Sequence, residues 1–345
     1  MIKQGLLRSV ALGAGLVGTM AQAVPVIPAE TGWSGHINLG VGAGTSESNM
    51  IAAIGSVDLG DDTVSSLRSS PESEDIVLPQ IQFEVAYTLG DSLTQFYLGN
   101  QQVDEVSFDL DTTLETHLGI RQQIDGIGRI DLSVAASSLP TDVWKDPYVV
   151  GENRGDTERT STGIHLGWDE IFGTRLEFAW SAAEIEIDDE RSGEDAALGL
   201  SGAQQRLLRR KGNVNRIELG YDWKINEHHR LVPEIGYLDY DLDGDAMAED
   251  GATLKLSYLY TRDQWRFVGK VFYEDLESDT VNPIYAKKRQ VETLGGSVTA
   301  FYVRPFGLKG WTANASAAYY EGDSNINFYD SSFGLVSIGM MYRFD

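Results

Sequence analysis

Apolar side chains recur at every second residue along most of this chain, and this alternation limits the possible folds more than any other feature. The last ten residues, VSIGMMYRFD, are one example. Their apolar set is Val336, Ile338, Met340, Tyr342 and Phe344. Because successive side chains of a strand point to opposite faces, a period of two predicts strands with one apolar face. About fourteen segments of the chain follow this pattern, so we expect an all-β protein.

The connections between these segments alternate in length. Some are short, such as residues 90–92, 226–229 and 262–264, whereas the others are long and polar: 45–75, 138–157, 188–213, 241–251, 276–290 and 321–332. Short turns at one end and long loops at the other are typical of outer-membrane barrels. The pattern therefore predicts a transmembrane antiparallel up-and-down β-barrel of about 14 strands, with twelve possible. A secreted sandwich or a β-helix is the alternative.

The positions of the aromatic residues favour the membrane barrel. Many tryptophans and tyrosines fall on the apolar face near strand ends: Trp33, Trp168, Trp180, Tyr221, Trp223, Tyr258, Tyr260, Trp265, Tyr302, Trp311, Tyr319 and Tyr342. Rings with an apolar body and a polar tip gather at membrane interfaces. In a sandwich core they would lie nearer the strand centres. Only a closed barrel pairs every backbone group of a β-structure inside lipid.

The first 23 residues have the layout of a cleaved secretory signal. Lys3 and Arg8 precede an apolar run that ends before Ala21-Gln22-Ala23. We therefore expect a signal peptide at 1–23, export through the periplasm to the outer membrane, and a single barrel domain at 24–345. The chain has no cysteine, so no disulfide holds the exported protein together. Its formal net charge of -25 argues against nucleic acid as a partner.

The final strand resembles the C-terminal assembly signal of bacterial outer-membrane barrels, in which an aromatic residue ends an alternating apolar strand. Here Asp345 follows Phe344, so the pattern is displaced by one residue. The chain also resembles a family of Gram-negative outer-membrane β-barrel proteins of unassigned function. That resemblance rests on ETGWSGHINLGVGAG with the nearby SNM, on DYDLDGDAMAEDG and on SIGMMYRFD. It implies a porin-like barrel that the outer-membrane assembly machinery inserts.

The face opposite the apolar set is expected to line the lumen. The candidate lumen and selectivity residues are Glu84, Glu115, His117, Arg121, Arg129, Asp131, His165, Arg175, Glu177, Arg216, Glu218, Lys224, Arg230, Glu234, Arg266, Lys270 and Arg343. Several of these bases lie near short turns and predict a basic collar there. A barrel of fourteen strands leaves a bore of roughly 10–15 Å inside its inward side chains. This predicts a channel for passive diffusion of small hydrophilic solutes or ions.

Two segments outside the strand pattern suggest contacts with ions or lipids. Asp239, Asp241, Asp243 and Asp250 approximate the spacing of a calcium loop, although the twelfth position lacks the usual glutamate. A Ca²⁺ site at 239–250 is therefore one hypothesis, and cation bridging to lipopolysaccharide phosphates is another. Residues 192–213 break the strand period and predict a short helix with a basic end. Such a helix could constrict the lumen, meet lipid phosphates or lie in solvent.

Two other functions compete with the channel. The barrel could be a non-conducting structural or binding protein whose acidic loops contact cations, lipopolysaccharide or partners. It could also be a hydrolase, since His117 or His165 could meet Ser133 or Glu115 in the lumen. The sequence contains no phosphate loop, zinc spacing or nucleophile elbow. We therefore expect no enzyme, no required cofactor and a monomer in the outer-membrane lipid.

Overall fold

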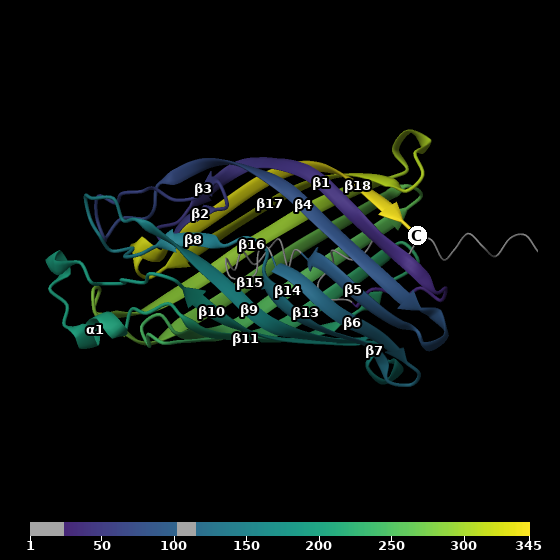
Figure 1. Cartoon of the computed structure of the whole chain (residues 1–345), viewed down its shortest axis with the longest axis horizontal. Helices are drawn as coiled ribbons and strands as arrows, with labels where there is room; N and C mark the ends of the chain where they lie inside the picture. Colours follow the sequence, from purple (N-terminus) through teal and green to yellow (C-terminus); the bar gives the residue numbers. More distant parts are fainter. Residues whose placement is uncertain (1–23, 102–114) are drawn as a thin grey trace, which may run out of the picture.

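The computed structural model describes residues 24–101 and 115–345, so the expected signal peptide lies outside the described residues. The described part folds into a barrel of long tilted strands (Figure 1). Its wall strands are β1 (Gly32–Glu47), β4 (Ser73–Leu89), β5 (Thr94–Gln101), β6 (Glu115–Ile124), β7 (Gly128–Ser137), β9 (Asp156–Asp169), β10 (Leu176–Ile187), β11 (Gly212–Tyr221) continued by β12 (Trp223–Lys224), β13 (His229–Leu242), β14 (Glu249–Arg262), β15 (Trp265–Asn282), β16 (Lys287–Val303), β17 (Trp311–Ser324) and β18 (Ser331–Phe344).

The barrel is closed. Each wall strand pairs antiparallel with its sequence neighbour in the wall, and β1 pairs with both β4 and β18. The closing register runs from Gly35 opposite Phe344 to Glu47 opposite Ser332. Within the described residues the wall has 14 strands, which confirms the expected all-β antiparallel barrel. Because the ring has no free edge, its ladders use the backbone groups of every wall strand.

The same described residues contain no helix that is both long and apolar enough to cross a membrane.

The outer surface of the barrel is apolar, as the alternation predicts. On β18, Val336 and Ile338 are 64% and 63% exposed, whereas Ser337 and Met341 between and beside them are 2% and 5% exposed. The other wall strands repeat this arrangement, with valine, leucine and isoleucine outward. In water such a surface would be costly, whereas in hydrocarbon it costs nothing. The exterior therefore suits a lipid bilayer.

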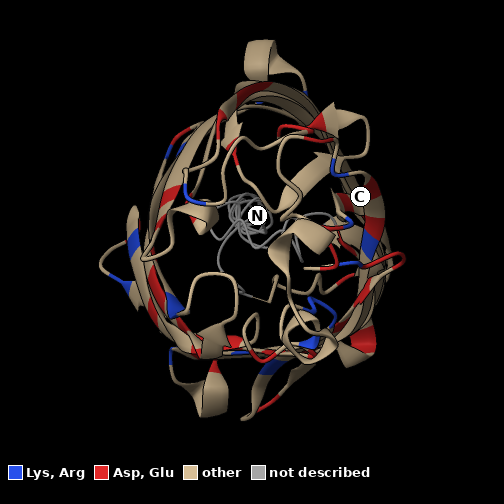
Figure 2. Ribbon diagram, turned by 90° about the vertical axis from the view of Figure 1, so that its left-hand side faces the viewer, with Lys and Arg blue, Asp and Glu red and all other residues tan. Residues whose placement is uncertain are grey.

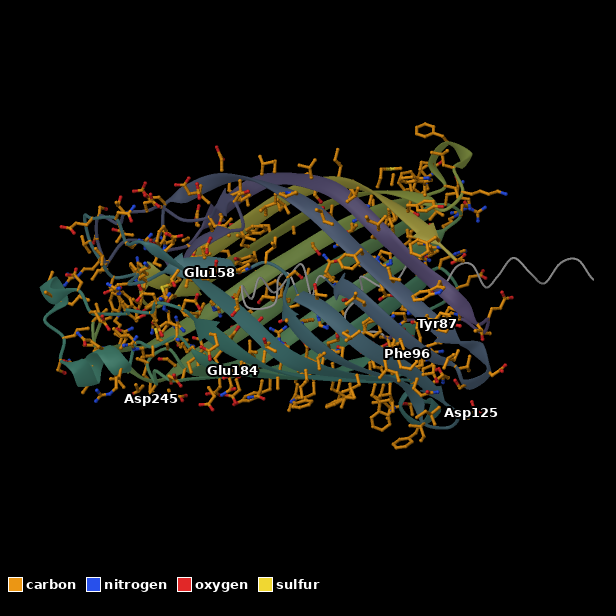
Figure 3. The ribbon with its side chains drawn as sticks, in the orientation of Figure 1. Tyr87, Phe96, Asp125, Glu158, Glu184 and Asp245 are labelled. Atoms are coloured by element: carbon orange, nitrogen blue, oxygen red, sulfur yellow. The ribbon has the colours of Figure 1, made fainter. Side chains whose placement is uncertain are left out.

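Aromatic rings gather outside the barrel at the end that has the short turns, here called the turn end. Trp33 packs on Tyr87, and Trp311 packs on Tyr342, with ring centroids 5.1 Å apart in both pairs. Trp265 likewise lies 4.7 Å from Tyr302. Figure 3 shows Tyr87 and Phe96 near this end, and acidic Glu158 and Glu184 toward the other. The rings form the girdle expected at a membrane interface.

The opposite end, here called the loop end, carries additional short elements. These are β2 (Ile51–Ile54), β3 (Val57–Asp58), β8 (Thr141–Trp144) and α1 (Gly202–Arg206). The long loop expected at 276–290 is wrong in extent. β15 continues to Asn282 and β16 starts at Lys287, so this connection is a strand hairpin with a short tip. Polar residues there still pair as strands because the extension stands beyond the apolar band.

The seam between the first and last strands depends on a close approach. An added Cβ at Gly35 would lie 2.6 Å from the ring of Phe344, so the ring covers the glycine on the outer face. Aromatic rings placed over strand glycines restore packing that glycine cannot supply. The final aromatic residue of β18 therefore packs directly on the first strand.

Candidate functional site

The lumen is the candidate site, and most predicted lining residues occupy inward positions of the wall strands. Figure 2 looks into the barrel from the loop end and shows acidic and basic residues distributed around the ring. Two candidates do not line the lumen. Arg175 precedes β10 and Lys224 ends β12, and both are exposed at the turn end. They lie at the ends of strands beside turns, where the alternation of a strand no longer fixes the direction of a side chain.

Arg121 is the centre of the strongest charged cluster of the wall. Its guanidinium is 0% exposed and lies 2.7 Å from Glu84 Oε2 and 2.9 Å from Asp131 Oδ2. It also stacks 3.7 Å from the ring centroid of Tyr97, whose hydroxyl donates to Asp131 at 2.7 Å. That ring lies over Gly119, where an added Cβ would be 2.6 Å away. Because Gly119 has no side chain, it leaves space on the inner wall for the Tyr97 ring and its contacts with Arg121 and Asp131.

His117 forms a second cluster beside the first. Its Nδ1 lies 3.2 Å from Ser133 Oγ, and its Nε2 lies 3.5 Å from Glu115 Oε2. The ring of His165 is 6.4 Å away, edge to face. A serine, a histidine and a carboxylate therefore do meet, as the hydrolase hypothesis requires. However, the amides of β6, β7 and β9 lie in the strand ladders, which directs them along the wall and away from the lumen.

A third group lies farther around the wall. The Nζ of Lys255 is 2.6 Å from Glu218 Oε1, and both side chains are buried. Arg216 and Glu234 are buried on the neighbouring inward positions of β11 and β13. Oppositely charged side chains thus face one another on this part of the wall. Acidic and basic side chains are therefore interspersed on this half of the lumen wall, and they do not form a ring of a single charge sign.

Two bases of the collar expected at the turn end lie beside acidic side chains. Arg129 lies 3.5 Å from Asp169 and 3.2 Å from Glu170, and Arg230 lies 3.0 Å from Asp222. Each of these bases therefore has acidic neighbours. Asp169 and Glu170 stand at the end of β9 and Asp222 lies between β11 and β12, so the turns bring these acids beside the bases.

The opposite wall, made by β1, β4 and β15 to β17, is mostly neutral and polar. A cavity inside the barrel is lined by Asn38, Gln80, Gln82, Val268, Lys270, Ser297, Thr299, Phe301, Asn314 and Ser316. Asn314 donates to Asn38 at 2.8 Å, and Asn38 donates to Gln82 at 3.0 Å. This amide chain crosses the seam above Gly339, where an added Cβ would lie 2.8 Å from Asn314 Oδ1. The lining offers both hydrogen-bond donors and acceptors to a solute.

The loops pack together at the loop end and form what we call the cap, the connections β1–β4, β7–β9, β10–β11, β13–β14, β15–β16 and β17–β18. One apolar core of the cap contains Val64, Tyr148, Leu208, Ala246, Met247, Ile326, Phe328 and Tyr329. Tyr148 and Tyr329 share a 2.7 Å hydrogen bond between their hydroxyls. Burial raises the pKa of both phenols, so both stay neutral. The loops of the cap therefore pack against one another around a shared apolar core.

A second apolar core joins the cap to the inner wall. Ile51, Ile54 and Leu59 of the β1–β4 loop pack against inward residues of β4, β15, β17 and β18, namely Ile76, Phe272, Tyr320 and Phe333. The upper lumen is therefore apolar where sequence reasoning expected polar lining. Adjacent aromatic residues such as Tyr319 and Tyr320 were the available signal, because a strand that buries both faces loses its alternation.

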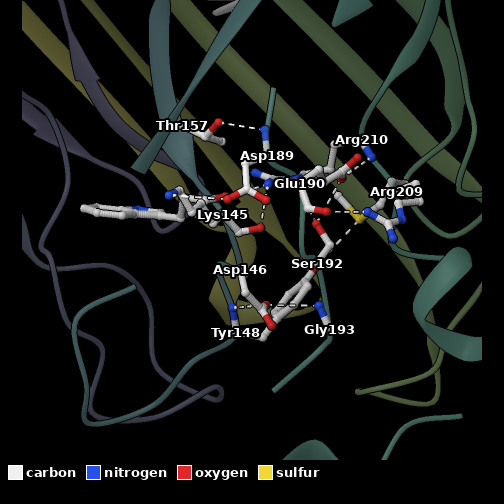
Figure 4. A network of polar contacts seen from close by, with 12 residues as sticks. Lys145, Asp146, Tyr148, Thr157, Asp189, Glu190, Ser192, Gly193, Arg209 and Arg210 are labelled. Carbon is white, nitrogen blue, oxygen red and sulfur yellow. Dashed lines mark hydrogen bonds and ion pairs between the residues drawn. The ribbon is translucent and has the colours of Figure 1, made fainter. Parts of the chain in front are cut away.

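Polar contacts fix the loops of the cap to one another (Figure 4). The carboxylate of Asp146 in the β7–β9 loop accepts hydrogen bonds from the backbone N–H groups of Gly193 and Asp195, both at 3.0 Å. Arg210 is buried and its Nε lies 3.3 Å from Glu190 Oε1. The predicted short helix is present as α1, and the segment around it packs into the cap, with Leu208 0% exposed.

Arg154 ties the β7–β9 loop to the β1–β4 loop. Its guanidinium donates to the carbonyl of Asn49 at 2.8 Å and to the carbonyl of Asp61. It also lies 4.2 Å from the ring centroid of Trp144. Burial lowers the pKa of Arg154 to about 10, so the group is charged at neutral pH. The contact fixes two long loops without a disulfide.

The four aspartates of the calcium hypothesis are not brought together. Asp239 and Asp241 stand on β13, Asp250 lies opposite Asp239 on β14, and Asp243 lies in the following loop. Alternate residues of an extended strand are about 6.6 Å apart, so their carboxylates do not converge as they do in a curled loop. Across residues 24–101 and 115–345, no three or more acidic or histidine side chains are grouped so that they could hold a metal ion.

Comparisons with solved structures find several to which this chain is similar. The chain is similar to the CymD monoaromatic hydrocarbon channel, with 11% identity, a TM-score of 0.49 and coverage of 90% of this chain and 88% of that chain. It is also similar to the toluene transporter TbuX of Ralstonia pickettii (12% identity, TM-score 0.44, 91% and 90% covered) and to the outer membrane channel DcaP of Acinetobacter baumannii (10%, 0.40, 91% and 97%). No curated protein sequence matches this chain.

A family model covers nearly the whole barrel, from β1 to the end of β18. The match spans residues 32–343 and includes the strands that close the barrel. The expectation of a barrel family without an assigned function is therefore confirmed. The chain belongs to the family described as "Protein of unknown function (DUF2860)".

Proposed function

We propose that this protein is a channel of the bacterial outer membrane for small hydrophilic solutes. The observation that carries the proposal is the polar cavity inside the barrel, between β1 and β4 on one side and β15 to β17 on the other. Amide and hydroxyl groups line it, with Lys270 as its charged member. A solute that leaves water keeps hydrogen bonds along such a wall, which lowers its desolvation cost. The channel needs no cofactor.

The placement of charges supports a path along the neutral wall. Arg121, Lys255 and Arg129 each lie beside acidic side chains of the barrel wall, so these charges largely neutralise one another and contribute little net field. The neutral wall has the amide chain from Asn314 to Gln82. Uncharged polar solutes therefore fit this lumen better than strongly charged ions. The apolar exterior and aromatic girdle would hold a single barrel in lipid as a monomer.

The test is single-channel conductance of the purified, folded protein in planar lipid bilayers. We expect discrete conductance steps from the wild-type protein. Gln82→Glu adds a negative charge to the cavity and should shift the reversal potential in a salt gradient toward cation selectivity. Gln264→Glu, the same change in an exposed turn, should leave it unchanged. Folded protein without conductance steps would remove the channel proposal.

The second candidate is a binding or structural barrel whose cap keeps the lumen closed. The two apolar cores of the cap favour it, because such packing holds loops in one conformation. Its acidic loops would then engage lipopolysaccharide through bridging cations. A hydrolase is less favoured, because the strand ladders use the amides around Ser133.

An engineered disulfide separates these two candidates. Ala53 of β2 and Asp142 of β8 are direct partners in an antiparallel pair. Such Cα atoms lie about 4.5–5.5 Å apart, within the range that a disulfide accepts. Because the chain has no cysteine, the double variant A53C/D142C forms one defined cross-link. If the cap moves during conduction, oxidation should lower the open fraction and reduction should restore it. Equal conductance in both states would contradict a moving cap.

A further inference from the structure

The segment before the first strand enters the turn end of the barrel. Val24 is 3% exposed and Ile27 is 7% exposed, whereas Val26 between them is 53% exposed. Pro25 and Pro28 fix their own φ angles and favour extended backbone in the residues before them. Residues 24–31, which bend at residues 29–30, are here called the strap, and they have two buried anchoring side chains.

The strap connects two distant parts of the wall. β1 and β9 are five strands apart around the ring of 14, which corresponds to a chord of about 25 Å in a barrel about 28 Å wide. Eight residues in extended conformation span about 26 Å. The strap runs from Val24 beside Gly167 of β9 to Gly32 at the start of β1. Eight residues are therefore enough to connect the two parts of the wall.

Val24 meets a buried carboxylate at that wall. The backbone N–H of Val24 faces the carboxylate of Asp169, the last residue of β9, which is 1% exposed. Arg129 lies 3.5 Å from Asp169, yet within the described residues neither carboxylate oxygen has a hydrogen bond of good geometry. Gly167 gives Val24 its place, because an added Cβ there would lie 3.2 Å from Val24 Cγ2.

The surroundings of Asp169 have too few positive charges. Arg129 is shared between Asp169 and Glu170. Glu177 is close enough to Asp169 for electrostatic repulsion between the two carboxylates. Arg230 is bound to Asp222. A buried carboxylate without full pairing is costly, and one additional cation with several N–H donors would satisfy it.

We propose that the carboxylate of Asp169, beside Arg129, binds the α-ammonium group of Val24 in the mature protein. The proposal rests on the signal peptide expected at 1–23 and goes beyond the channel function. Signal peptidase would add water across the bond between Ala23 and Val24. Ala23 would leave with a carboxylate, and Val24 would keep a protonated amine. That amine brings one positive charge and three N–H donors to the Asp169 carboxylate.

This arrangement couples processing to the shape of the lumen. Before cleavage, Val24 offers Asp169 one neutral N–H group. After cleavage, the ion pair fixes the free end of the strap across the turn end, and β1 fixes the other end. The strap then narrows the opening in every mature molecule. A chain that is not cleaved at Ala23 lacks this charge-assisted contact.

The test measures chemical modification of the α-amine in protein purified from outer membranes. N-terminal sequencing and intact mass should first identify Val24 as residue one. An amine-reactive ester at neutral pH, read by mass spectrometry, should then label the wild-type α-amine at least about tenfold more slowly than the free peptide Val-Pro-Val-Ile, the factor for one unit of pKa. Asp169→Asn should remove this protection. Glu170→Gln, which changes the neighbouring carboxylate, should keep it.

Each outcome decides the proposal. A different first residue, or labelling as fast as that of the free peptide, would overturn it. Equal labelling of the wild type and of a folded Asp169→Asn variant would also overturn it. The comparison with the peptide needs no variant, so it stands even if Asp169→Asn fails to fold. Conductance of the wild-type protein is unaffected by this result, so the channel proposal is tested separately.

Discussion

Individual residues of the lumen wall are organised around buried charge pairs. Arg121 is enclosed by Glu84, Asp131 and the ring of Tyr97, and that ring rests on Gly119. The alternation predicted that these charged residues face inward. It did not predict that they meet, because the register between strands follows from the turns and is absent from the period-two pattern.

Removing the charge of Arg121 should therefore destabilise the barrel. Arg121→Met leaves two buried carboxylates without their partner, so the free energy of unfolding should fall by about 3–5 kcal/mol. Urea titration of the protein in lipid vesicles, followed by tryptophan fluorescence, measures the change. The control is Arg262→Met, whose guanidinium is 67% exposed beside Asp263 and should change stability by less than about 0.5 kcal/mol. Equal midpoints for both variants would contradict the role of the cluster.

Among the elements, the wall strands were predictable and the cap was not. The strand pattern predicted the outward set of β18 from Val336 to Phe344, although the strand itself already begins at Ser331. The cap depends on contacts between residues far apart in the chain, such as Tyr148 with Tyr329 and Asn49 with Phe328. Single apolar residues in polar loops show no period, so nothing in the sequence indicated that these loops share a core.

The last strand carries a prediction about assembly. Phe344 covers Gly35 at the seam, so Phe344→Ala removes both the aromatic end of the strand and the cover of the glycine. We expect less folded protein in the outer-membrane fraction, measured by heat-modifiable gel mobility. Deleting Asp345 leaves the ring in place and should not reduce the folded amount. If Phe344→Ala assembles as well as the wild type, the ring has no role in assembly.

For the whole molecule, alternation and the lengths of the connections were sufficient to predict a closed barrel, but not the state of its lumen. A mean hydropathy of -0.22 conceals the apolar exterior, because inward polar residues balance it at every second position. In the structure, Gly119 and Gly295 accommodate the rings of Tyr97 and Phe272, so these glycines allow close packing on the wall.

The central claim is that alternate residues of the wall face lipid. The most direct test is a cysteine scan of residues 336–343 with nitroxide labels in lipid vesicles, which this cysteine-free chain permits. Electron paramagnetic resonance then measures access of oxygen, which dissolves in lipid, and of a water-soluble nickel complex. We predict high oxygen access at 336, 338, 340 and 342 and low oxygen access at 337, 339, 341 and 343. Equal access at both sets, or nickel access at the even positions, would contradict the barrel in a membrane.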